Sequence, residues 1–83
     1  MPEMLVNICW AGGWDEYVID PSVTRLETPE EIEAYNARVA KGWGGDPVIG
    51  HREWLRVLFV RREFPDHPEH TLFKIVRYVR GGD

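Results

Sequence analysis

The fold is decided by residues 28–41, TPEEIEAYNARVAK, which carry the signals of a capped amphipathic helix. Thr28 predicts the N-cap, Pro29 suits the first helical position, and Glu31 completes a capping box with Thr28. Acidic residues fill the first turn, and Arg38 complements the negative end of the helix dipole. At helical spacing the apolar residues form one stripe, made of Ile32, Tyr35 and Val39, which Trp43 would extend.

A β-hairpin is predicted before this helix, with strands at residues 5–10 and 14–19. Gly12-Gly13 supplies the positive φ angles that a tight turn needs. A two-residue loop at these glycines pairs apolar residues across the strands, Ile8 with Tyr17 and Val6 with Ile19. A three-residue loop would place Ile8 opposite Glu16, so the two-residue loop is preferred. Asp20-Pro21 is expected to end the second strand, because proline cannot continue a ladder.

Two more strands are predicted after the helix. Residues 54–60, WLRVLFV, are rich in β-branched and aromatic residues, and residues 71–80, TLFKIVRYVR, alternate cleanly. A loop with two prolines, residues 64–70, connects them. The element order β-β-α-β-β predicts an α+β fold in two layers, with a single helix packed on a mostly antiparallel four-stranded sheet. Residues 1–83 are expected to form a single small domain.

Composition and charge limit the function classes. The chain has 83 residues, a hydrophobic fraction of 43% and one cysteine, which fits a reducing compartment. No basic, apolar leader and no membrane-spanning stretch is visible, so a cytoplasmic protein without a membrane partner is expected. Residues 1–47 carry a formal charge of −6 and residues 48–83 carry +2. The acidic half argues against indiscriminate nucleic-acid binding, and the basic half allows a local patch.

One helix can cover only one face of the predicted sheet. The face expected beneath the helix holds Leu55, Val57, Phe59, Phe73, Ile75 and Val79. The opposite face mixes large apolar side chains with basic tips, a combination that is typical of protein interfaces. The residues predicted to contact a partner are Trp54, Arg56, Arg62, Lys74, Tyr78 and Arg80.

The sequence therefore predicts a non-enzymatic protein–protein interaction module, such as a small inhibitor or accessory protein, whose partner is a larger protein. A homodimer through the same face is also open. Two alternatives remain: Arg and Lys stems could simply cover the apolar groups, or the face could bind single-stranded nucleic acid. Trp43 is read either as an anchor of the interface or as a residue that folds back on the core.

No catalytic or cofactor signature is found, and neither an enzyme nor a cofactor is expected. His67 and His70 have His-x-x-His spacing, but prolines place them in a loop, and zinc would need further ligands. Cys9 lies in the middle of a predicted strand, where a free cysteine usually behaves as a small apolar group. The glycine pairs lack the strand–glycine–helix context of a phosphate loop.

Overall fold

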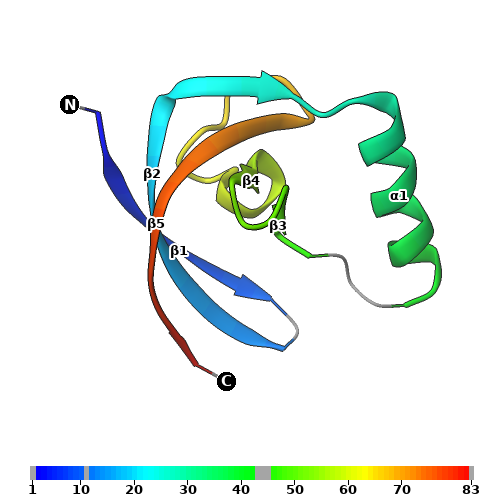
Figure 1. Ribbon diagram of the computed structural model, residues 1–83, viewed down its shortest axis with the longest axis horizontal. Helices are drawn as coiled ribbons and strands as arrows, with labels where there is room; N and C mark the ends of the chain where they lie inside the picture. The colour runs from blue at the N-terminus through cyan, green and yellow to red at the C-terminus, as the bar shows by residue number, and fades with distance from the viewer. Residues whose placement is uncertain (1, 11, 43–45, 83) are drawn as a thin grey trace.

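The computed structural model describes residues 2–10, 12–42 and 46–82 (Figure 1). Their elements, in chain order, are β1 (Met4–Trp10), β2 (Gly13–Leu26), α1 (Pro29–Ala40), β3 (Val48–Ile49), β4 (Trp54–Arg56), a 3-10 helix η1 (Val57–Val60) and β5 (Thr71–Gly82). The strands of this described part form one antiparallel sheet in the order β1-β2-β5-β4-β3. The α+β class, with one helix packed against an antiparallel sheet, is confirmed, although the sheet has five strands rather than four.

Helix α1 begins as its sequence predicts. The Thr28 hydroxyl accepts a hydrogen bond from the Glu31 backbone N–H at 3.2 Å, and the Glu31 carboxylate accepts one from the Thr28 N–H at 2.8 Å. This reciprocal pair is the expected capping box, with Pro29 in the first turn. The helix ends at Ala40, and the Lys41 N–H donates to the Arg38 carbonyl at 3.1 Å. Trp43 lies outside the described residues, so its predicted role is not addressed by the structure.

The first hairpin has a different register from the expected one. Val6 lies opposite Tyr17, and Trp10 lies opposite Gly13, so the strands are offset by two residues from the predicted pairing. An offset of two keeps every side chain on its predicted face, and Val6, Ile8, Tyr17 and Ile19 are all buried together. In this register the Trp10 ring lies where a side chain at Gly12 would be, so glycine is needed at that position.

Strand β2 does not end at Asp20-Pro21, contrary to expectation. Asp20 lies opposite Lys74 and Thr24 opposite Phe73, so residues 21–23 bulge out of the ladder. The Asp20 carboxylate closes this bulge by accepting hydrogen bonds from the Ser22 N–H at 3.0 Å and hydroxyl at 2.5 Å. A bulge is a place where a strand tolerates proline, and it bends the strand sharply (Figure 1).

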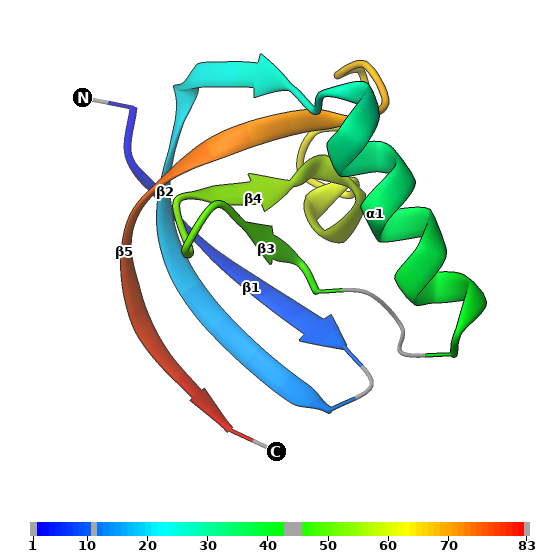
Figure 2. The same cartoon turned by 45° about the vertical axis from the view of Figure 1, so that its right-hand side comes forward.

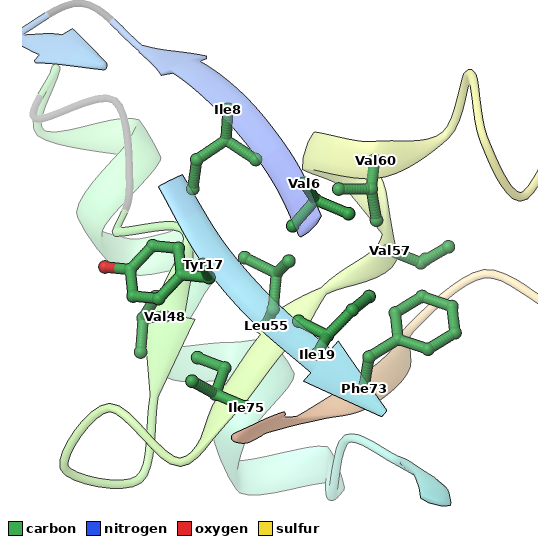
Figure 3. Packing of buried hydrophobic residues seen from close by; sticks show 10 residues of the cluster. All are labelled: Val6, Ile8, Tyr17, Ile19, Val48, Leu55, Val57, Val60, Phe73 and Ile75. Carbon is green, nitrogen blue, oxygen red and sulfur yellow. The ribbon is translucent and has the colours of Figure 1, made fainter. Parts of the chain in front are cut away.

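The strand predicted at residues 54–60 is wrong beyond Arg56. Residues Val57–Val60 instead form η1, which packs against β1. Val57 and Val60 are 2% and 1% exposed, so this turn of 3-10 helix buries both valines beside Val6 (Figure 3). Burial of these side chains overrides the β-propensity of the run, as tertiary context often does. The short strand β3 was not expected, and it joins β4 through a turn with positive φ angles at residues 50–52.

The core lies within the curved sheet, not beneath the helix as expected. It comprises Val6, Ile8, Tyr17, Ile19, Val48, Leu55, Val57, Val60, Phe73 and Ile75 (Figure 3). The bends in β2 and β5 allow the sheet to curl around these residues, and η1 also packs into them. Phe59 is only partly buried, and Val79 is 37% exposed.

Helix α1 therefore packs against the opposite face of the sheet (Figure 2). Arg25 and Arg56 both lie opposite Leu72 in the ladder, so the three share one face, and both arginines contact α1. Leu72 is fully buried beneath them. No residue of α1 is fully buried, and Glu31, Ile32 and Tyr35 are partly buried. The polar contacts that attach the helix include those of Arg25 with Glu31 and of Arg56 with Tyr35.

Candidate interaction surface

Arg56 attaches α1 to the sheet and is not part of an open surface. It is 4% exposed, and its guanidinium lies 3.4 Å from the Glu27 carboxylate. It also donates to the Asp46 carbonyl and stacks over the Tyr35 ring at 4.6 Å from the centroid. Arg56 was expected to contact a partner, but its donors are directed into the protein. The sequence pattern predicts the face of the sheet on which Arg56 lies, but it does not predict that α1 covers this face.

A second polar contact fixes the start of the helix. The guanidinium of Arg25 and the carboxylate of Glu31 form a bidentate ion pair, with both N–O distances at 2.9 Å. This ion pair, together with the hydrogen bond from the Thr28 N–H, lowers the pKa of Glu31 from 4.5 to about 2. Arg25 thus ties β2 to the first turn of α1 and to the capping box at the same time.

Trp54 and Lys74 are brought together as cross-strand neighbours. The Lys74 ammonium lies 5.4 Å from the Trp54 ring centroid, and the Arg25 guanidinium lies 4.9 Å from it. Lys74 also contacts the Glu53 carboxylate at 3.5 Å. The ring of Trp54 is therefore half-buried and already has cationic partners within the chain.

Tyr78 lies on the face opposite to the predicted one, because β5 contains bulges. Ile75 pairs with Ile19 and Tyr78 with Tyr17, so Tyr78 shares the core side of the sheet. Its ring contacts the Tyr17 ring edge-on at 5.4 Å between centroids and is 45% exposed. Local desolvation and the negative charge of the nearby Asp15 carboxylate raise the pKa of Tyr78.

Arg80 lies on the outer face of the sheet. Its guanidinium contacts the Glu16 carboxylate at 2.6 Å and lies 5.9 Å from the centroid of the Trp14 ring. Arg62 is exposed in the turn after η1 and is not part of the sheet. Trp54, Lys74, Tyr78 and Arg80 thus all lie on or beside β5, but they do not share one face, and Arg62 lies apart from them.

Tyr78 and Arg80 belong to an edge of β5 that the sequence did not reveal. On one side, β2 pairs with β5 from Thr71 to Gly82, with register shifts that leave Val76 and Val79 without a partner on β2. On the other side, β4 pairs only with residues 72–74, and the Glu53 carbonyl accepts the Ile75 N–H at 2.8 Å. Beyond Ile75, no backbone partner occurs on this side of β5 among the described residues, and Figure 2 shows this half of the strand at the margin of the sheet. We call residues 76–82 the free edge.

The free edge is exposed and partly apolar. Val76, Tyr78 and Val79 are 44%, 45% and 37% exposed. Arg77 and Arg80 alternate with them and are also exposed. Unpaired N–H and C=O groups along such an edge are a template for an added strand. The short length of β4 creates this edge, and no signal in the apolar run of residues 54–60 indicates where pairing stops.

A cavity of about 390 Å³ opens beside the β1–β2 turn, lined by Trp10, Asp15, Tyr17, Arg38, Asp46, Pro47, Val48 and Arg52. The Arg52 guanidinium also lies 5.9 Å from the centroid of Tyr78, so this cavity borders the free edge. Arg52 has a left-handed backbone, with φ of 71°. Within residues 2–10, 12–42 and 46–82, no group of three or more His, Cys, Asp and Glu side chains could hold a metal ion.

Comparison of the chain with known protein families, curated proteins and solved structures finds no match. The described residues also include no helix with the length and apolar content needed to cross a membrane.

Proposed function

We propose that this chain is a non-enzymatic protein-binding module that captures an extended segment of its partner by strand addition along the free edge of β5. The observation that carries the proposal is that, among the described residues, residues 76–82 have no backbone partner on the side of β5 that faces away from β2. In strand addition, main-chain hydrogen bonds supply much of the affinity, and side chains at alternate positions supply specificity. A small inhibitor or accessory protein could bind a larger target in this way.

The side chains at this edge support a protein ligand. Tyr and Arg are enriched in the residues that dominate binding energy, and Tyr78 and Arg80 both lie here. Val76 and Val79 add exposed apolar area that a neighbouring strand would bury. Single-stranded nucleic acid remains the alternative, but the two tryptophan rings nearest to β5, Trp14 and Trp54, already have cations within the chain. Base stacking needs open ring faces.

The test is a proline scan of the free edge, at residues 76, 77, 79 and 80. Peptide ligands are first selected from a displayed random library against the intact chain. A proline whose lost N–H faces β2 should lower stability, whereas one whose lost N–H faces the free edge should keep stability and abolish peptide binding. Val39→Lys is the control, because Val39 is 45% exposed on α1, as Val76 is 44% exposed on β5.

Amide hydrogen exchange provides the second measurement. The bound peptide should slow exchange of amides within residues 76–82, since an added strand takes up the unpaired groups. The proposal is wrong if every stable proline variant binds as the parent chain does. It is equally wrong if the selected peptides protect α1 or β1 and leave the free edge unchanged.

A further inference from the structure

The charge along β5 indicates what kind of strand fits it. We infer that the captured segment is acidic, with two neighbouring carboxylates that contact Arg77 and Arg52 on opposite faces of the free edge. This inference rests on the proposed strand addition and adds the chemistry of the partner. It starts from the composition of β5, TLFKIVRYVRGG, which contains three basic residues and no acidic one.

Two of the basic residues of β5 already have carboxylates within the chain. Lys74 contacts Glu53 at 3.5 Å, and Arg80 contacts Glu16 at 2.6 Å. Arg77 has no carboxylate within ion-pair distance in the described part of the chain, and neither does Arg52. These two guanidinium groups are therefore the ones at the free edge that remain available to a ligand.

The two arginines are presented on different sides of the sheet. Tyr17 points to the core face, so its neighbour Val18 points to the outer face. Arg77 pairs with Val18 and therefore also lies on the outer face. Arg52 approaches the Tyr78 ring, which lies on the core side with Tyr17. Successive side chains of a strand point to opposite faces, so adjacent residues of an added strand would meet one arginine each. Two consecutive acidic residues, flanked by apolar ones opposite Val76 and Val79, satisfy this arrangement.

The same charges disfavour a second copy of this chain as the occupant. Pairing the free edge with the free edge of another copy would bring the Arg77 guanidinium of each copy into one ladder, and Arg77 has no carboxylate within ion-pair distance in the described part of the chain. Like charges across a ladder are destabilising. Basic side chains on an exposed edge are a common way to prevent edge-to-edge self-association. The carboxylates of an acidic strand would instead attract the arginines at this edge.

The experiment uses three labelled, end-capped peptides that are identical except at the central pair. The common frame alternates Val, Thr and Ile, and the centre is Glu-Glu, Gln-Gln or Lys-Lys. Fluorescence anisotropy with the full chain should give the tightest binding for Glu-Glu, weaker binding for Gln-Gln and the weakest for Lys-Lys. Arg77→Gln and Arg52→Gln should each weaken Glu-Glu binding about two- to fivefold and leave Gln-Gln binding unchanged. Arg62→Gln is the matched control, because Arg62 is exposed and lies outside the sheet.

The outcomes separate this inference from the function on which it rests. If Gln-Gln and Glu-Glu bind equally and both protect residues 76–82 from exchange, strand addition stands and the acidic partner is wrong. If no peptide protects the free edge, strand addition itself fails. Sedimentation that shows a dimer disrupted by Val79→Pro would overturn the inference in favour of self-pairing. Tighter binding of oligo(dT) than of Glu-Glu, with a steep salt dependence, would overturn it in favour of nucleic acid.

Discussion

The buried ion pair between Arg56 and Glu27 should make Arg56→Met one of the most destabilising single substitutions outside the core. Both side chains are only 5% exposed, and the guanidinium lies 3.4 Å from the carboxylate. After the substitution, the Glu27 carboxylate keeps, among the residues that the structure describes, only the His70 imidazole within ion-pair distance, at 3.6 Å. Removing one partner of a buried pair costs about 3–5 kcal/mol, because a charge is left buried without compensation.

This cost is large for a chain of 83 residues. Such a domain has a free energy of unfolding of about 4–12 kcal/mol. Loss of the cation–π contact with Tyr35 adds about 1 kcal/mol. Arg56→Met should therefore remove a third or more of the total stability and can unfold the chain if its stability lies at the low end.

The assay is urea unfolding followed by tryptophan fluorescence, with Arg80→Gln as the comparison. Arg80 contacts Glu16 at 2.6 Å but is 71% exposed at its side chain, so its removal should cost far less stability than removal of Arg56. The double variant Arg56→Met with Glu27→Gln should recover about 2 kcal/mol relative to additive single variants. If Arg56→Met costs no more than Arg80→Gln, or if the two substitutions are additive, the burial argument is refuted.

Three further predictions concern stability. Glu31 has a pKa of about 2 in the folded chain and an ordinary value of 4.5, so its contribution to the free energy of unfolding is complete above pH 4.5 and is lost as pH falls through 2. Glu31→Gln should therefore flatten the dependence of stability on pH in this range, and unchanged acid sensitivity of the variant would contradict the prediction. Gly12→Ala should displace the Trp10 ring, break its 3.0 Å hydrogen bond to Asp15 and cost about 1 kcal/mol, with an altered near-ultraviolet circular dichroism spectrum as the check. Ile19→Val, at a fully buried position, should cost about 1 kcal/mol in urea unfolding, and a neutral result would show that the site collapses around the missing methylene.

The sequence predicted the parts of the fold that depend on local chemistry. The capping box joins Thr28 and Glu31, which are only three positions apart in the sequence, and it forms as expected. The alternation in β1 and β2 placed Val6, Ile8 and Tyr17 on the correct face, because an offset of two residues does not change the face of a side chain.

The parts that failed depend on contacts between distant elements. Residues 57–60 are apolar enough for either a strand or a helical turn, and only their burial against β1 decides for η1. The bulges in β5 change the face of Tyr78, and no local pattern in the sequence marks them. Strict alternation of side chains, which holds only for a regular strand, predicts the wrong face for Tyr78 because β5 contains bulges. It also does not predict the burial of Arg56, which depends on the position of α1.

The polar attachment of α1 has a consequence for the order in which this protein comes apart. Apolar contacts within the curved sheet strengthen with added sulfate, whereas exposed ion pairs weaken with salt. Because α1 buries no side chain fully and is held by Arg25 and Arg56, it can leave the sheet as a unit while the core of β1, β2 and β5 remains packed. Acid and added salt act on the partly exposed Arg25–Glu31 pair and would therefore favour this detachment, whereas the buried Arg56–Glu27 pair is screened much less. The first species to accumulate would be a β-sheet that exposes Leu72.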